Sequence, residues 1–206
     1  MNDLRHQRGA RQLARAVAST RAPVALALAS VALLSGCATS AEPPRVYDLG
    51  TTRDLPARRL RHSIDVSLPM AILPYDSDRL VIRTGPDTIA YLQGSQWVDG
   101  LPRLLQARIR DALDNAGEGA RPPTGLSDET LKVSIRRFEV DVTQGLAIVS
   151  LSVRLVSTSS ERVIAGRIIR ATAPAPAHGG EAMAAALNAA AAKALRQIIL
   201  LASAGH

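Results

Sequence analysis

The stretch LKVSIRRFEV, residues Leu131–Val140, decides the fold together with AIVSLSVRLVS, residues Ala147–Ser157. Both alternate apolar and polar residues with a period of two, which is typical of strands with one buried face. A third run of this kind, Val163–Thr172, follows a turn at Thr158–Glu161. We therefore expect three consecutive strands that form an antiparallel meander with one face on the core.

The apolar pattern changes parity inside the first of these strands. Leu131 and Ile135 occupy odd positions, whereas Phe138 begins an apolar set at even positions. One extra residue in a strand produces such a change, because it shifts every following side chain to the other face. A β-bulge or bend is therefore expected near Arg136-Arg137.

Shorter alternating runs precede the meander. Val46–Leu49 is expected to form a short strand, and Ser63–Leu68 a half-buried strand with its odd residues exposed and its even residues inward. Leu80–Arg83 and Ile89–Leu92 flank the sequence Gly-Pro-Asp at Gly85–Asp87. This is turn chemistry, so the two runs are predicted to form a β-hairpin.

Two segments carry apolar residues at helical spacing. The first begins after Asp99, a candidate N-cap with Pro102 in the permissive first turn, and its apolar stripe extends to Ala116. The second, Glu181–Ala202, is rich in alanine and therefore strongly helix-prone. The fold class predicted is α+β: a mostly antiparallel β-sheet with two main α-helices packed on one side.

The N-terminal segment has the organisation of a lipoprotein signal peptide. Five arginines and one aspartate lie before an uncharged run at Ala22–Leu34, which is shorter than a membrane-spanning helix requires. The run ends in Leu34-Ser35-Gly36-Cys37, which fits the bacterial lipobox. We expect residues 1–36 to be the signal peptide, residues 37–45 an acylated cysteine with a flexible tether, and residues 46–206 the folded domain. A soluble secreted protein or a buried free cysteine is the alternative.

The residue after the cysteine indicates which membrane the protein is attached to. Ala38 stands where aspartate would retain an enteric lipoprotein at the inner membrane, so the periplasmic face of the outer membrane is favoured over the inner membrane. The acyl chains on Cys37 would be the contact with the membrane. No second long apolar run follows, so no transmembrane helix is predicted.

Composition excludes one large class of function. The net charge of the chain is +7, but the leader contributes +4 of it, and the remaining basic residues are interspersed with acids and few aromatics. This is not the clustered basic surface of a nucleic-acid-binding protein. With Cys37 as the only cysteine, no intramolecular disulfide can form.

Catalytic, cofactor and metal sites are not predicted. None of the four histidines has a ligand-type residue at helical spacing, and the single thiol is assigned to the anchor. Asp76 and Asp78 are followed by neither the glycine nor the distal glutamate of a calcium loop. His178 lies in a Pro-Ala-His-Gly-Gly segment typical of a solvated loop. We therefore expect a protein that is not an enzyme.

Three apolar residues are candidates for a partner interface. Trp97, the only tryptophan, either anchors a partner or lies in the core beneath the first helix, and the core is the favoured interpretation. Ile199 and Leu200 extend the stripe of the last helix beyond one face. Fuller burial and a partner surface remain equally open for these two residues.

The order of elements resembles the ABC-type transport auxiliary lipoproteins, which include the lipoprotein of the paraquat-inducible Pqi system and companions of MCE-protein lipid transporters. The residues that carry this resemblance are Leu34-Ser35-Gly36-Cys37, Tyr47-Asp48-Leu49, Leu73-Pro74-Tyr75, Asp78–Arg83, Ile89-Ala90-Tyr91, Trp97, Leu101-Pro102, Leu104-Leu105 and Arg137-Phe138-Glu139.

The resemblance implies a non-enzymatic envelope component that works beside a periplasmic MCE-domain protein with an ABC permease and ATPase. The cargo would be phospholipid or another hydrophobic molecule, and several copies of the chain could form a ring. No catalytic residues are carried over. An envelope assembly or regulatory lipoprotein that binds a synthase or an outer-membrane barrel is the alternative function.

Overall fold

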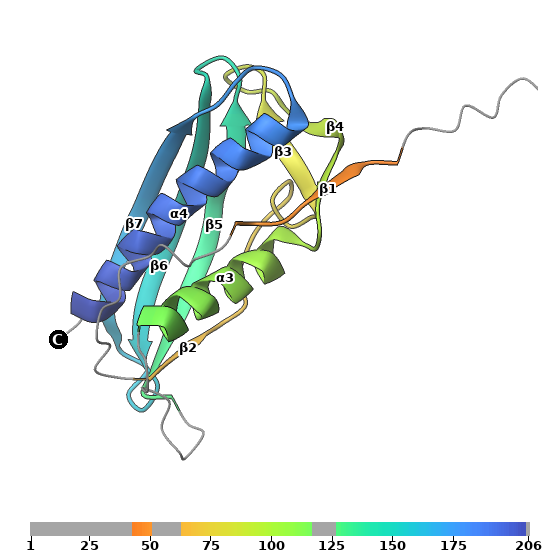
Figure 1. The fold of residues 1–206 in the computed structure, drawn as a ribbon. Coiled ribbons are helices and arrows are strands. Elements are labelled where there is room, and N and C mark those ends of the chain that lie inside the picture. Colours follow the sequence, from red (N-terminus) through yellow and green to blue (C-terminus); the bar gives the residue numbers. More distant parts are fainter. Residues whose placement is uncertain (1–42, 51–62, 117–126, 205–206) are drawn as a thin grey trace, which may run out of the picture. The chain divides into compact units, whose positions relative to one another are not determined.

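The structure is a computed structural model, and it describes residues 43–50, 63–116 and 127–204. These residues form one mixed sheet with two helices on one side (Figure 1). The elements are β1 (Arg45–Tyr47), β2 (Ile64–Val66), β3 (Arg79–Arg83), β4 (Ile89–Trp97), α3 (Leu101–Ala116), β5 (Glu129–Asp141), β6 (Leu146–Ser157), β7 (Val163–Pro174) and α4 (Gly180–Ala204).

The described strands are arranged in the order β1-β4-β3-β5-β6-β7, and β2 pairs with β5 beyond the end of β3. The hairpin β3–β4 and the meander β5–β6–β7 are antiparallel, as predicted. β1 on β4, β2 on β5 and β3 on β5 are parallel, over three residues each. The α+β class is confirmed, and the short parallel pairings are an addition that alternation alone does not specify.

The predicted bulge lies in β5. Ile135 pairs with Leu151 of β6, but Arg137 pairs with the next residue, Ser150, so Arg136 is the extra residue. The shift returns Phe138 to the helix-covered face, where it is 1% exposed. It also turns Arg137 and the following alternate residues to the opposite face of the sheet.

A second irregularity corrects the prediction for Ser63–Leu68. The N–H of Ser67 donates to Leu131 O, but the next bond to β5 is from Met70 to Val133 O, so three residues here span two on the partner strand. The extra residue lies at Ser67-Leu68, because the Met70–Ser134 pair places buried Pro69 beside Val133. Leu68 therefore leaves the inward face and is 54% exposed.

The N-cap of helix α3 lies one residue later in the sequence than predicted. The Gly100 carbonyl accepts the first helical hydrogen bond, from the N–H of Leu104 at 3.1 Å, so Gly100 is the N-cap. Asp99 lies just before it, where its carboxylate accepts from the Gly100 N–H at 2.6 Å and from the Arg103 guanidinium. The Arg103 hydrogen bond, and then that of Gly100, lower the pKa of Asp99.

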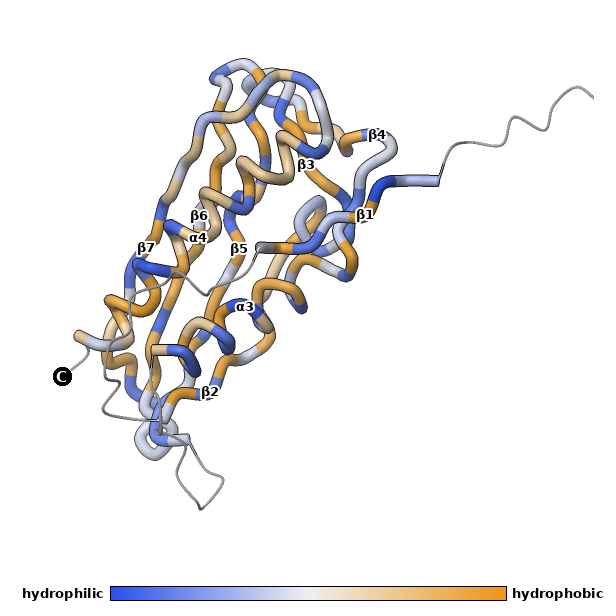
Figure 2. Tube along the Cα trace, in the orientation of Figure 1, coloured by the Kyte–Doolittle hydropathy of each residue, from blue (hydrophilic) through white to orange (hydrophobic). Residues whose placement is uncertain are grey.

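Helix α4 covers the meander, with its alanine-rich stripe against β5, β6 and β7. Apolar residues predominate along α4 and alternate with polar ones along the strands (Figure 2). By length and composition α4 is apolar enough to cross a bilayer, but half of its most apolar window is buried within the domain, as in a core helix. Small alanine side chains let the helix lie close to the sheet.

Candidate functional site

The expected lipidation site, Cys37, lies outside the described residues. Trp97 lies at the end of β4, is 1% exposed and meets the ring of Phe138 edge to face at 6.0 Å between centroids. The core interpretation of Trp97 is therefore confirmed. Its indole is not available as a surface anchor, because the sheet and α3 enclose it.

The two residues at the end of α4 separate in the structure. Ile199 is fully buried and packs with Ala112 and Ala116 of α3, so it joins the two helices instead of facing a partner. Leu200 is 41% exposed. Of the three candidate interface residues, only Leu200 presents its side chain at the surface of the described domain.

The polar residues predicted to be inert stay apart. Within residues 43–50, 63–116 and 127–204, no three His, Cys, Asp or Glu side chains gather in a group that could hold a metal ion. His178 is exposed in the loop between β7 and α4. His62 lies outside the described residues.

Among the described residues, the most concentrated polar cluster surrounds Glu139, whose side chain is fully buried in β5. Its carboxylate accepts from the Tyr75 hydroxyl at 2.5 Å and from Arg83 Nε at 2.8 Å. Arg137, two residues earlier on the same face, donates from Nε at 2.7 Å. One carboxylate thus joins the turn before β3 and the end of β3 to β5, which lies more than fifty residues later in the sequence.

These contacts determine the charge of the cluster. Burial alone would raise the pKa of Glu139, but hydrogen bonds from Arg83, Tyr75 and Arg137 outweigh it and lower the pKa, so the group is ionised. Burial, and then the bond to Glu139, raise the pKa of Tyr75 well above its usual range. The phenol therefore stays protonated as a donor.

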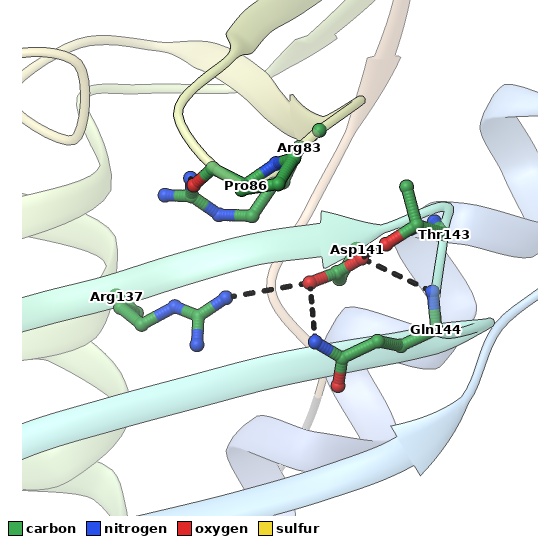
Figure 3. A pocket seen from close by; sticks show the side chains of 7 residues that line it. Arg83, Pro86, Arg137, Asp141, Thr143 and Gln144 are labelled. Atoms are coloured by element: carbon green, nitrogen blue, oxygen red, sulfur yellow. Dashed lines mark hydrogen bonds and ion pairs between the residues drawn. The ribbon is translucent and has the colours of Figure 1, made fainter.

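An open pocket of about 670 Å³ lies beside this cluster (Figure 3). Asp141 at its floor accepts from the Thr143 hydroxyl at 2.7 Å and from the Gln144 side-chain amide at 3.0 Å. Arg137 Nη2 approaches the same carboxylate at 3.7 Å. Burial would raise the pKa of Asp141, but the bonds from Thr143 and Gln144 lower it. The pocket is lined by Arg83, Gly85, Pro86, Arg137, Asp141, Thr143 and Gln144.

The chemistry open to this arrangement is limited. Both carboxylates are ionised and occupied by donors, and both arginines already face a carboxylate. A general base needs a pKa near the working pH and free access to a substrate proton, and neither Glu139 nor Asp141 has these properties. The cluster fixes the position of the β3–β4 hairpin relative to the meander.

Sequence reasoning did not predict this cluster as a site, although its members belong to segments that carry the family resemblance. Glu139 lies more than fifty residues after Tyr75 and Arg83 in the sequence, and the three residues follow no periodic pattern. The available signal was a carboxylate in a strand flanked by Phe138 and Val140, both core residues. A charge in that position is rarely buried without partners.

Two solved structures superpose on about three quarters of this chain. A crystal structure of a DUF330-family protein from Xanthomonas campestris superposes with a TM-score of 0.70 at 25% identity, covering 78% of this chain and 96% of that one. The crystal structure of a second, uncharacterized protein shares the fold with a TM-score of 0.61 at 17% identity, covering 76% of this chain and 97% of that one.

An uncharacterized protein of Bradyrhizobium diazoefficiens is 27% identical over 160 residues, which are 74% of this chain and 43% of that protein. This chain thus matches less than half the length of that relative. The model of the ABC-type transport auxiliary lipoprotein component matches residues 47–199, from the end of β1 into α4. The chain belongs to the family of ABC-type transport auxiliary lipoprotein components.

Proposed function

We propose that the chain is a lipid-anchored periplasmic subunit of an ABC/MCE-type system that moves phospholipid or other hydrophobic molecules across the envelope. Its folded domain docks a partner protein and performs no chemistry. The observation that carries the proposal is the family match over residues 47–199, which takes in nearly the whole described domain. The members of this family are auxiliary lipoprotein components of ABC-type transport.

The polar chemistry of the domain supports docking over catalysis. Its most buried carboxylate, Glu139, is held ionised by three donors from different segments. Such a network fixes the relative positions of secondary-structure elements, and the surface around it is correspondingly well defined. A rigid surface lowers the entropic cost of binding a partner.

The N-terminal sequence supports the anchor. A basic leader, a short apolar run and Leu34-Ser35-Gly36-Cys37 together match the requirements for acylation at Cys37. Several acyl chains on one residue give stable attachment, because each buried methylene contributes about 0.8 kcal/mol. Ala38 supports the outer membrane as the site of attachment. In this proposal the partner is an MCE-domain protein that connects to an ABC permease and ATPase.

Affinity purification from detergent-solubilised envelopes of the native host tests the proposal. The acylated protein should retain an MCE-domain protein together with the permease and ATPase. A Cys37→Ala variant, which cannot be acylated, is the matched control and should lose the envelope fraction. Retention of a cell-wall synthase or an outer-membrane barrel, with no transport component, would contradict the proposal and favour an assembly role.

Leu200 is the remaining candidate for the docking contact, since it is the exposed member of the three predicted residues. We expect Leu200→Glu to reduce recovery of the transport components, because it places a charge in an apolar contact. Ala189→Glu, at another exposed position of α4, is the control. Equal recovery with both variants would exclude Leu200 from the interface.

A further inference from the structure

The two faces of the sheet differ in what lies against them. Both helices pack on one face (Figure 1), and no described helix packs on the other, which the turn before β3 reaches at Glu139. Strand register identifies the residues on the uncovered face, because paired residues share a side. Three rows of pairs on this face run across the meander: Lys132–Arg154, Ser134–Ser152–Ile168 and Arg137–Ser150–Arg170.

This uncovered face concentrates positive charge. Lys132, Arg136, Arg154 and Arg170 are exposed, and the structure pairs none of them with a carboxylate among the described residues. Arg137 is 36% exposed. Within the meander the acids on the same side are Glu139 and Asp141, which are buried at one end of the face. Asp65 of β2 lies on this side at the other end, where its carboxylate contacts Arg110 of α3 at 3.6 Å.

The net positive charge of residues 37–206 is concentrated on the uncovered face of the sheet. The whole chain is +7, and the leader with five arginines and one aspartate removes +4 of this, which leaves +3 for residues 37–206. The three strands of the meander contribute five cationic side chains to this face against two carboxylates, an excess of +3. The rest of residues 37–206 therefore carries no net charge. A ligand or surface attracted to this face must be anionic.

Exposed apolar side chains interrupt the cations on the same face. Met70 pairs with Ser134, which places it in one row with Ser152 and Ile168, and Met70 and Ile168 are 65% and 48% exposed. Ile72 and Leu73 continue the Met70 segment at 75% and 72% exposure. Large apolar residues among cations are typical of surfaces that rest in the headgroup region of a bilayer.

We propose that the uncovered face of the sheet lies on an anionic phospholipid bilayer, so that the helices point away from the membrane. The inference rests on the proposed function in one respect, the acyl anchor. Seven residues lie between Cys37 and Arg45 at the start of β1, so the eight steps of the fully extended tether reach about 28 Å. An anchored domain is therefore held within reach of the lipid headgroups, where each basic side chain strengthens attraction to an anionic surface.

Site-specific fluorescence on vesicles tests this orientation. The chain has one cysteine, so in the acylated protein an introduced cysteine is the only thiol that a dye can label. Thr172→Cys labels the uncovered face, and Ala189→Cys labels the exposed side of α4. The full acylated protein is reconstituted into vesicles of phosphatidylcholine with or without phosphatidylglycerol. Quenching by spin-labelled headgroups and by aqueous iodide is then measured.

The expected result is lipid quenching with iodide protection at position 172 in vesicles that contain phosphatidylglycerol, and the reverse at position 189. The double substitution Lys132→Gln with Arg154→Gln should shift the orientation equilibrium by about 25-fold, since one basic side chain contributes about fivefold. Arg103→Gln with Arg196→Gln, an equal charge change on the helix side, should leave the equilibrium unchanged.

Three outcomes would overturn the inference. Iodide access at position 172 in both lipid mixtures would show that the face is not on the bilayer. Equal protection in phosphatidylcholine alone would remove the role of charge. Protection that requires an added transport component would identify an acidic protein as the occupant. Recovery of the transport components by the same protein would leave the proposed function standing in each case, whereas an unmodified Cys37 would remove both.

Discussion

The helix-covered and uncovered faces of the meander are made by the same three strands, yet they follow different rules. Leu151 and Ser152 are neighbours in β6, but Leu151 is fully buried beneath the helices and Ser152 lies half-buried among cations. The covered face holds Leu, Ile, Val and Ala in a continuous core. The difference indicates that one face specifies the fold, while the other is free to carry surface chemistry.

The largest expected effect contrasts these two neighbours. Leu151→Ala should destabilise the domain by about 3 kcal/mol, because it removes buried methyl groups and leaves a cavity in the core. Ser152→Ala should change the stability by less than about 0.5 kcal/mol. Urea unfolding followed by Trp97 fluorescence measures both. Similar costs for the two substitutions would mean that both faces are packed, contrary to the comparison.

Glu139 is one of several residues of the uncovered face that are buried although no helix covers them. We expect Glu139→Gln to destabilise the domain by about 2 kcal/mol, because Arg83 and Arg137 lose a charged acceptor. Glu181→Gln removes an exposed carboxylate of the same kind and is the control. Chemical denaturation would show whether the two substitutions differ; a Glu139→Gln protein as stable as the parent would mean the cluster is dispensable.

The same cluster should make stability depend on pH at both ends of the scale. The pKa values of Glu139 and Asp141 are lowered, so the unfolded chain binds protons first and stability falls as pH drops below about 4. The pKa of Tyr75 is raised, so stability also falls as pH rises above about 10. Thermal unfolding across this range checks both signs.

Two variants test which residues cause the loss of stability at low pH (the acid limb) and at high pH (the alkaline limb). Glu139→Gln with Asp141→Asn should flatten the acid limb without changing the alkaline one by as much. Tyr75→Phe should flatten the alkaline limb, since it removes the titrating phenol. A steep acid limb that survives the double substitution would place the titrating groups elsewhere in the protein.

The smallest expected effect concerns the cations of the uncovered face. Lys132→Gln and Arg154→Gln should each change the free energy of unfolding by less than about 0.5 kcal/mol, because both side chains are exposed and lack an ion pair among the described residues. Urea unfolding measures this. A loss comparable to that of Leu151→Ala would mean that the cations stabilise the fold instead of serving an external surface.

Much of the fold followed from period and composition, because the meander and both helices bury one face each. The bulge at Arg136 was visible as a change of parity between Ile135 and Phe138. The direction of β1, β2 and β3 was not visible, since parallel and antiparallel strands with one buried face share the same alternation. Leu68 was misplaced because one extra residue at Ser67-Leu68 shifts the register before Pro69.

The functional residues were harder to predict than the fold. Trp97 and Ile199 are large and apolar, and sequence alone does not distinguish a buried anchor from an exposed one. The Glu139 cluster joins Tyr75 and Arg83 through tertiary contacts that no local spacing encodes. The uncovered basic face required strand register, because Lys132, Arg154 and Arg170 are scattered along the sequence and meet only across the ladder.

The tether at Cys37 is the claim on which anchoring, docking and membrane orientation all depend. Intact mass spectrometry of the protein isolated from its native membranes tests it directly. We expect a chain that begins at Cys37 and carries the added mass of acyl groups on that residue. A chain that begins at Met1, or a Cys37 with an unmodified thiol, would contradict the account.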